Sequence, residues 1–326
     1  MTTRRLPRSA VAAAFALVGA AGPLLAASGP VFQSPEGSVR LVSAWASAPA
    51  GGDARLGVAF TLEPGWHVYW KNPGDAGYPP ALELARDAPL TGAELRFPAP
   101  ERYELAGGLV AIGYEDEVIY PIDARLANDV GPTAAIRGEL DYLVCADTCL
   151  PYTAALELDL PVGEPTEDPE IAPRLEAWRA RLPLSAASAL DRVDAGLEPL
   201  SGPEMTLRLA FEGEGIEAVR PDLFFESHPL VAFDRPRFAA ANGRPGFEVV
   251  VRPHDETKLL PASLDLAWTA TGFERGGVPA AWSGTLSLAR PAPVGGERWA
   301  ALLALGLILA VVLALVLYRH RSSKPS

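Results

Sequence analysis

Cys145 and Cys149 are the residues of this sequence whose type and spacing could do chemistry. They are the only two cysteines among 326 residues, and three residues separate them. We expect them to pair with each other in an oxidising compartment. A disulfide exchanges when a thiolate attacks one sulfur and the other sulfur leaves with the bonding electrons. The pair could therefore carry two electrons between partner proteins.

The residues around the pair predict a hairpin. Alternating apolar residues lead into Cys145, a short turn of small and polar residues follows, and a strand leaves after Pro151. A three-residue hairpin loop places the two cysteines opposite each other. Opposed residues of antiparallel strands have Cα atoms about 4.5–5.5 Å apart, which suits a disulfide.

Loop length favours a redox role over a structural one. A disulfide that closes a ring of about five residues stabilises by roughly 2 kcal/mol in the chain-entropy model, against nearly 5 for a loop of about 100 residues. A tight, accessible bridge at a turn is also easier to reduce. Asp141 and Asp147 lie nearby in sequence and would raise a thiol pKa, so we expect a passive relay rather than a strong oxidant.

Copper handling is an alternative, because two thiolates at this spacing could hold Cu(I). Zinc would need two more ligands. His67, His228 and His254 are scattered singly, so we expect no metal site, and no cofactor motif is present. A second alternative is a non-catalytic protein-binding module in which the disulfide only pins a hairpin.

Both ends of the sequence carry targeting patterns. Residues 1–27 have a basic start, a short apolar run and small residues at the end, which is typical of a signal peptide. Residues 299–318 contain no charge and are long enough to cross a bilayer as a helix. The basic segment 319–326 follows and should stay cytoplasmic. These patterns predict a single-pass protein of the inner (cytoplasmic) membrane with its ectodomain in the periplasm.

The net charge of −12 excludes nucleic acid as an expected partner, since such a surface repels phosphate. Apolar alternation and turn residues predict an all-β ectodomain in two sandwiches. We place the first at residues 31–163 and the second at 191–292, with a linker and one helix, Glu170 to Leu182, in 164–190. The expected strands are Ser38–Trp45, Arg55–Leu62, Trp66–Trp70, Glu94–Phe97, Glu117–Ile122, Ala135–Val144, Ala154–Leu160, Glu204–Phe211, Asp222–Phe225, Leu230–Phe233, Phe247–Val251, Ser263–Trp268 and Trp282–Ala289.

Two segments resemble the N-terminal periplasmic portion of DsbD/ScsB-type thiol:disulfide interchange proteins. One is the cysteine segment at 142–151, YLVCADTCLP, and the other is the Trp-rich segment at 65–80, GWHVYWKNPGDAGYPP. The Trp-rich segment has its own interpretation, in which Trp66, Val68 and Trp70 fill the core from one face. In a sharper hypothesis, the loop from 72 to 80 covers the cysteine pair.

The resemblance implies immunoglobulin-like β domains whose cysteine pair takes electrons from a membrane-embedded cysteine domain. The pair then passes them to disulfide-bonded periplasmic partners. Full-length members of the family continue into a multi-helix membrane domain and a thioredoxin-like domain, whereas the span 299–318 contains no cysteine. We therefore expect a separate membrane thiol reductant and periplasmic client proteins. The resemblance is compatible with a subunit of a protein-disulfide reductase and does not by itself assign enzyme activity.

Overall fold

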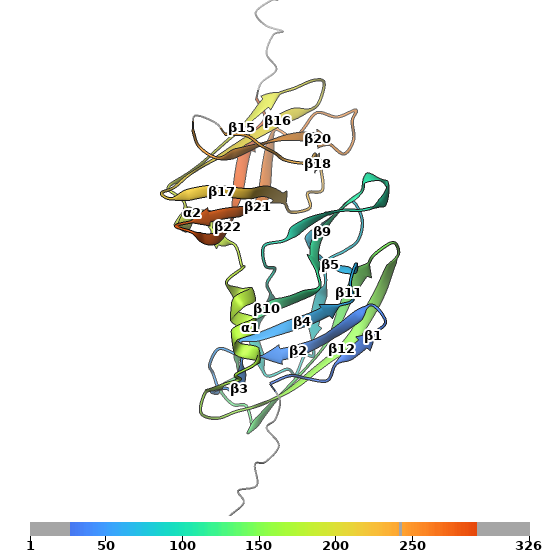
Figure 1. Cartoon of the computed structure of the whole chain (residues 1–326), viewed down its shortest axis with the longest axis vertical. Helices are drawn as coiled ribbons and strands as arrows, with labels where there is room; N and C mark the ends of the chain where they lie inside the picture. Colours follow the sequence, from blue (N-terminus) through green and yellow to red (C-terminus); the bar gives the residue numbers. More distant parts are fainter. Residues whose placement is uncertain (1–26, 241–242, 292–326) are drawn as a thin grey trace, which may run out of the picture. The chain divides into compact units, whose positions relative to one another are not determined.

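The computed structural model describes residues 27–240 and 243–291, which are mostly β (Figure 1). The expected signal (1–27), except Ala27, and the expected anchor and tail (299–326) lie outside the described residues. None of the helices in the described part is long and apolar enough to cross a membrane. The described residues divide into two compact units, each discontinuous in sequence. Unit 1 contains 27–69, 79–97 and 113–180, and unit 2 contains 70–78, 98–112 and 181–291.

Unit 1 is built from two main sheets. Its elements are β1 (Phe32–Ser34), β2 (Gly37–Ser43), β3 (Trp45–Ser47), β4 (Leu56–Leu62), the start of β5 (His67–Gly74), β6 (Ala81–Leu84), β7 (Leu90–Leu95), the end of β9 (Val110–Glu115), β10 (Glu117–Leu126), β11 (Thr133–Cys145), β12 (Cys149–Pro161), β13 (Thr166–Glu167) and α1 (Ile171–Arg179). One sheet has the order β1-β2-β4-β10-β7. The other has the order β12-β11-β5-β9-β8, in which β8 (Glu101–Glu104) belongs to unit 2, and β6 also pairs with β11.

Aromatic side chains pack the two sheets of unit 1 face to face. Phe60 on β4 meets Tyr142 on β11 edge-on, with ring centroids 5.0 Å apart, and it meets Tyr120 on β10 at 5.8 Å. All three are buried. Edge-on aromatic pairs of this kind stabilise beyond their buried area. They form a rigid layer beneath the end of the β11–β12 hairpin.

The helix α1 packs on unit 1, as the periodicity of 170–182 predicts. Ile171, Ala172 and Leu175 are buried against the sheet that contains β2, β4 and β10. Gly57 permits this close approach, because a Cβ there would lie 2.9 Å from Leu175 Cδ1. Asp168 begins the helix by accepting hydrogen bonds from the backbone N–H groups of Glu170 and Ile171, at 2.9 and 2.8 Å.

Unit 2 is a second pair of packed sheets. Its elements are the end of β5, β8 (Glu101–Glu104), the 3-10 turn η1 (Ala106–Gly108), the start of β9, β14 (Leu184–Ser185), α2 (Ala186–Ala189), β15 (Arg192–Pro199), β16 (Met205–Glu212), β17 (Ile216–Phe225), β18 (Val231–Phe233), β19 (Arg237–Phe238), β20 (Gly246–Pro253), β21 (Ser263–Arg275) and β22 (Val278–Ala289). The sheets have the orders β14-β22-β21-β17 and β15-β16-β20-β18, and β19 pairs with β20. Phe211 and Trp268 join them, with ring centroids 5.3 Å apart.

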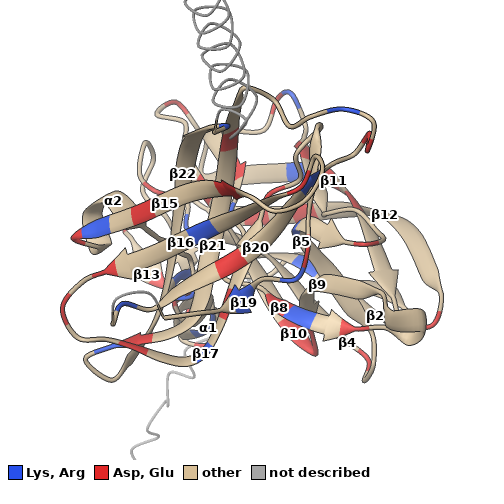
Figure 2. Cartoon of the chain, turned by 90° about the horizontal axis from the view of Figure 1, so that it is seen from above, with Lys and Arg blue, Asp and Glu red and all other residues tan. Residues whose placement is uncertain are grey.

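Each strand expected from the sequence overlaps an observed strand, and the all-β prediction is confirmed. Charged side chains are interspersed on the strands rather than separated by sign. In Figure 2, a basic band on β16 lies beside an acidic band on β20, where Arg208 and Glu248 form an ion pair at 3.0 Å. Such exposed pairs contribute little to stability but keep the surface of unit 2 mixed in charge.

Candidate functional site

The two cysteines close a long β-hairpin. Strands β11 and β12 pair in continuous register from Thr133 opposite Pro161 to Cys145 opposite Cys149. Buried residues alternate with exposed ones along most of β12, so one face packs on the sandwich while the other faces solvent. The predicted hairpin and its disulfide are both confirmed, with an S–S distance of 2.08 Å.

The two sulfurs lie in different environments. Cys145 has no exposed surface, whereas Cys149 is exposed at the start of the edge strand β12. The turn between them is held by a hydrogen bond from Ala146 N to Thr148 O, 3.1 Å long. A thiolate from another protein can therefore reach Cys149, and Cys145 is then the sulfur that leaves. The sequence did not indicate which sulfur is attacked.

Strand β5 supplies the side chains nearest to the sulfurs. His67 is the direct cross-strand partner of Cys145. The hydroxyl of Tyr69 lies 3.8 Å from Cys149 Sγ, and His67 Nε2 lies 3.3 Å from the same hydroxyl. Sequence reasoning missed both residues as parts of the site, because they are about 80 positions from Cys149. The available signal was their place in the Trp-rich segment.

Burial keeps both β5 side chains neutral near pH 7. His67 is 1% exposed, and its burial lowers the pKa of the imidazole from its ordinary value. Tyr69 has no exposed surface, and burial raises the pKa of its phenol. Desolvation disfavours the charged form in both cases. The disulfide thus lies beside a neutral imidazole and a neutral phenol.

Tyr120 fixes Tyr69 from behind. Its hydroxyl donates a 2.8 Å hydrogen bond to the backbone carbonyl of Tyr69, inside the core of unit 1. The ring of Tyr120 is itself held edge-on by Phe60, Phe97 and Tyr114, with centroids 5.8, 5.4 and 5.3 Å away. This hydrogen bond and the packing around Tyr120 hold the backbone of Tyr69 in place.

A second anchor lies three residues past Cys149. Tyr152 stacks on Tyr142, with ring centroids 5.6 Å apart, and its hydroxyl donates a 2.7 Å hydrogen bond to the carboxylate of Glu36. Glu36 is only 7% exposed. The hydrogen bond from Tyr152 is the main cause that lowers the pKa of Glu36. This contact ties the start of β12 to the turn between β1 and β2.

We predict that Tyr152→Phe destabilises the protein in a pH-dependent way. A carboxylate with a lowered folded pKa stabilises the native state above its unfolded pKa, ordinarily 4.5, and that contribution is lost as pH falls through the folded pKa. The thermal midpoint of Tyr152→Phe should therefore lie below that of the wild type at neutral pH. The difference between the two thermal midpoints should become smaller at acidic pH. A gap of equal size at neutral and acidic pH would contradict this role for Glu36.

The Trp-rich segment differs from its expected one-face pattern. Four successive residues, from His67 to Trp70, are buried, while Trp66 is only half-buried. A strand covered on both faces loses the alternation that a half-exposed strand has. The interpretation as core is thus right for Val68 and Trp70, but the other face is buried as well. The hypothesis that residues 72–80 cover the cysteine pair is not supported, because Cys149 is exposed.

The copper alternative concerns the reduced pair. In this structure both sulfurs are bonded to each other, so neither is a thiolate. Among the residues that the structure describes, no group of three or more His, Cys, Asp or Glu side chains could hold a metal ion. His228 and His254 contact each other in unit 2, where His254 Nε2 lies 3.1 Å from the His228 carbonyl oxygen.

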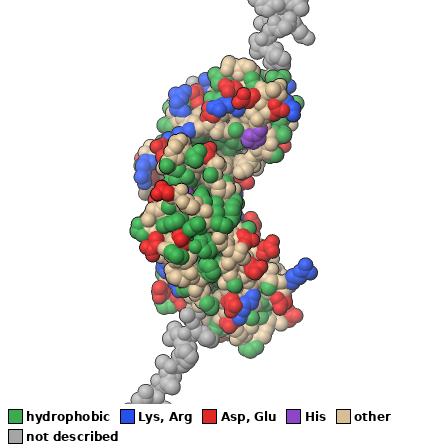
Figure 3. Space-filling view, turned by 90° about the vertical axis from the view of Figure 1, so that its right-hand side faces the viewer, with side chains coloured by type: hydrophobic (Ala, Val, Ile, Leu, Met, Phe, Trp, Pro, Cys, Tyr) green, Lys and Arg blue, Asp and Glu red, His purple; other side chains and the backbone are tan. Residues whose placement is uncertain are grey.

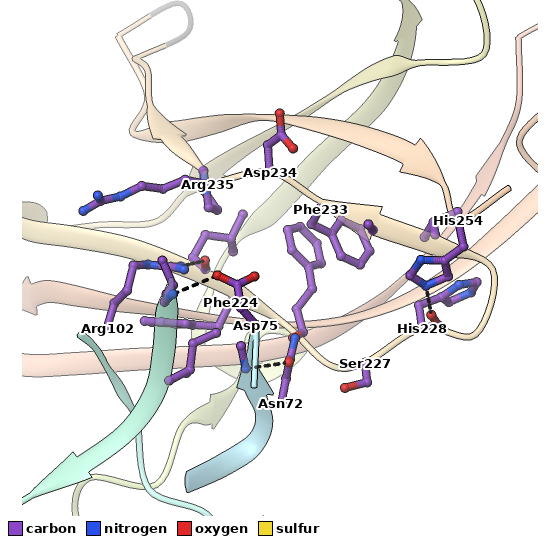
Figure 4. A pocket seen from close by; sticks show the side chains of 18 residues that line it. Asn72, Asp75, Arg102, Phe224, Ser227, His228, Phe233, Asp234, Arg235 and His254 are labelled. Atoms are coloured by element: carbon purple, nitrogen blue, oxygen red, sulfur yellow. Dashed lines mark hydrogen bonds between the residues drawn. The ribbon is translucent and has the colours of Figure 1, made fainter. Parts of the chain in front are cut away.

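That histidine pair borders a recess in unit 2 with a volume of about 570 Å³ (Figure 4). The polar side chains of the recess are largely engaged with one another. Arg102 forms a two-pronged ion pair with Asp222 at 2.8 and 3.1 Å, and it also donates to the Leu223 carbonyl. Asn72 donates to the Phe225 carbonyl at 2.8 Å. We interpret the recess as the place where the β8–β9 hairpin packs against β17 within unit 2.

Figure 3 shows the molecule from the side on which the β11–β12 turn lies in Figure 1. Hydrophobic side chains are interspersed there with acidic and basic ones.

Comparisons with known proteins agree with the expected resemblance. Residues 38–161 match the family model described as thiol:disulfide interchange protein DsbD, N-terminal. These residues contain both cysteines and the whole Trp-rich segment. No curated protein sequence matches the chain.

A solved structure supports the fold of both units. The N-terminal periplasmic domain of ScsB from Proteus mirabilis matches with a TM-score of 0.62 and 18% identity, covering 82% of this chain and all of that one. The Enterococcus faecalis adhesin ACE, which binds its ligands by the collagen hug model, aligns over 82% of this chain and 97% of its own at 12% identity. Its TM-score is only 0.17, so it carries no argument.

Proposed function

We propose that this chain, whose residues 38–161 match the N-terminal domain family of thiol:disulfide interchange protein DsbD, is itself a thiol:disulfide interchange protein. Electrons pass through Cys145 and Cys149. The observation that carries the proposal is the pairing of one exposed cysteine with one buried cysteine at the tip of a hairpin. A bond placed for stability alone would close a longer loop.

The reaction has two steps in each direction. A thiolate of the reductant attacks Cys149 Sγ, the S–S bond breaks, and Cys145 takes the electron pair. The second thiol of the reductant then displaces Cys149 from the mixed disulfide, leaving the reductant oxidised and this chain reduced. Toward a client, the Cys149 thiolate attacks the client disulfide. Cys145 then attacks Cys149 Sγ and releases the client thiol.

The location and partners follow from the same proposal. The hairpin works in the periplasm, and residues 299–318 anchor the chain in the inner membrane. A membrane thiol reductant supplies the electrons, because residues 299–318 contain no cysteine. Disulfide-bonded periplasmic proteins receive them.

The reduction potential of the pair tests the proposal. The full chain is equilibrated with glutathione buffers and then quenched with a thiol-alkylating reagent. We expect the cysteine pair to be half-reduced at a potential above about −300 mV, which is the range of disulfides that exchange readily. A potential well below that value would mark a structural disulfide. The chain would then fit the alternative of a binding module with a pinned hairpin.

A further inference from the structure

The contacts around Cys149 form a continuous chain of polar atoms that ends inside the core. Cys149 Sγ lies 3.8 Å from the Tyr69 hydroxyl, which lies 3.3 Å from His67 Nε2. The outer end, at Cys149, is exposed, while His67 and Tyr69 are almost fully buried. We propose that Tyr69 and His67 are a proton relay for Cys149, with Tyr69 touching the reacting sulfur and His67 acting through Tyr69. This inference rests on the proposed function and deepens it.

The need for such a relay arises in the reduced protein. The nucleophile in disulfide exchange is a thiolate, and an unassisted cysteine with a pKa of about 8.5 is mostly protonated at neutral pH. Cys149 must therefore lose a proton before it attacks a client. Asp147 in the β11–β12 turn is acidic and gives the thiolate no electrostatic support. The polar side chain in contact with Cys149 Sγ is that of Tyr69 on β5.

The relay moves one proton without changing the electron count. In the thiol form, Cys149 S–H donates to the Tyr69 oxygen, and the Tyr69 O–H donates to neutral His67 Nε2. The S–H bond breaks as an O–H bond forms on Tyr69, and the original O–H proton moves to His67. The thiolate keeps the electron pair of the broken S–H bond. In the product, imidazolium donates to Tyr69, and Tyr69 donates to the thiolate.

The geometry fits each role. A neutral imidazole has one ring nitrogen that accepts a hydrogen bond and can take up a proton, whereas an imidazolium could not. Tyr69 is positioned by Tyr120 through its own carbonyl, so its hydroxyl is held beside the sulfur. The charged residues closest in sequence to the site are Lys71 on β5, Glu115 at the end of β9, Asp141 on β11 and Asp147 in the β11–β12 turn. All four are exposed, so solvent screens them.

The pH dependence of Cys149 alkylation tests the relay without any partner protein. In the reduced full chain carrying Cys145→Ala, only Cys149 can react with iodoacetamide, and the rate follows its thiolate fraction. Adding Tyr69→Phe keeps the ring and removes the hydroxyl. Loss of a hydrogen bond to a charged group changes an ionisation constant, here that of the Cys149 thiol, by about tenfold. We therefore expect the rate below the pKa to fall about tenfold and the midpoint to move to higher pH.

Matched variants separate the relay from a general disturbance. Tyr152→Phe makes the same chemical change three residues from Cys149, on a hydroxyl that binds Glu36 instead, and should leave the midpoint unchanged. His67→Gln should slow alkylation by itself, yet add nothing when Tyr69→Phe is already present, because His67 acts through Tyr69. The relay would be refuted if Tyr69→Phe and its parent had the same pH dependence of Cys149 alkylation. It would also be refuted if the effects of His67→Gln and Tyr69→Phe on the alkylation rate were fully additive.

A measurement on unaltered side chains removes any dependence on variant folding. The ring signals of His67 in the wild-type full chain report its pKa by nuclear magnetic resonance in oxidised and reduced protein. We expect a higher pKa in the reduced protein, since a thiolate then faces the imidazolium across Tyr69. Equal values in both states would overturn the relay. The proposed function would be untouched by that result, because it depends on the reduction potential and on mixed disulfides.

Discussion

Cys145→Ala should react with a model disulfide and hold it, whereas Cys149→Ala should hardly react. With Ellman's reagent as the disulfide, the reduced Cys145→Ala chain presents its exposed Cys149 and forms a mixed disulfide that no second thiol resolves. In Cys149→Ala, the remaining sulfur has no exposed surface. It reacts only when the hairpin end opens. An opening free energy of about 3 kcal/mol would slow the reaction on the order of 100-fold.

Release of the yellow thiolate measures both rates, and gel mobility under non-reducing conditions detects the adduct with a protein client. The wild type is the control: it should release two equivalents of thiolate and end as the internal disulfide. Similar rates for the two single variants would mean that burial does not protect Cys145. Attack on the disulfide would then not be directed to Cys149.

The hairpin and its disulfide could be predicted from the sequence because they are local. Five consecutive residues contain both cysteines and the turn, and the alternation of apolar residues predicts the flanking strands. Residues opposed across so short a loop have little freedom to pair otherwise. The helix α1 was predictable for the same reason, since the spacing of Ile171 and Leu175 lies within one segment.

The surroundings of the disulfide could not be predicted, because they depend on pairing across the chain. His67 faces Cys145 only because β5 joins β11 in one sheet, and nothing in the spacing of 67 and 145 encodes that register. The strands β8 and β9 were missed for another reason. Gly107 and Gly108 between them, both at positive φ, are typical of a loop and mask the short strands on either side.

The segment at 65–80 shows how alternation can mislead. Trp66, Val68 and Trp70 suggested a strand with one buried face, yet His67 and Tyr69 are buried as well. A polar histidine at an apparently outward position has two readings from sequence, a solvent-facing residue or a functional one. A functional histidine differs from a solvent-facing one in being buried beside a specific partner, and this burial is seen only in the structure.

The largest expected loss of stability in unit 1 comes from Tyr120→Ala. This ring has no exposed surface and contacts three other aromatic rings. Its removal leaves a cavity between the sheets, for which large-to-small aromatic substitutions lose about 3–5 kcal/mol of unfolding free energy. Tyr120→Phe keeps the ring and loses one hydrogen bond, worth about 1 kcal/mol. Urea unfolding of the two variants and the wild type measures both losses.

The two variants also distinguish the role of the Tyr120 ring in core packing from the role of its hydroxyl in positioning Tyr69. Tyr120→Phe should remain folded, but it releases the carbonyl of Tyr69 that the Tyr120 hydroxyl holds at 2.8 Å. If core packing alone fixes the Tyr69 hydroxyl beside Cys149, alkylation of Cys149 in Tyr120→Phe will match that of its parent. If the hydrogen bond is required, the Cys149 midpoint will shift in the same direction as in Tyr69→Phe and by less. Equal losses of stability in Tyr120→Phe and Tyr120→Ala would contradict the cavity argument, because the hydroxyl would then account for the whole effect.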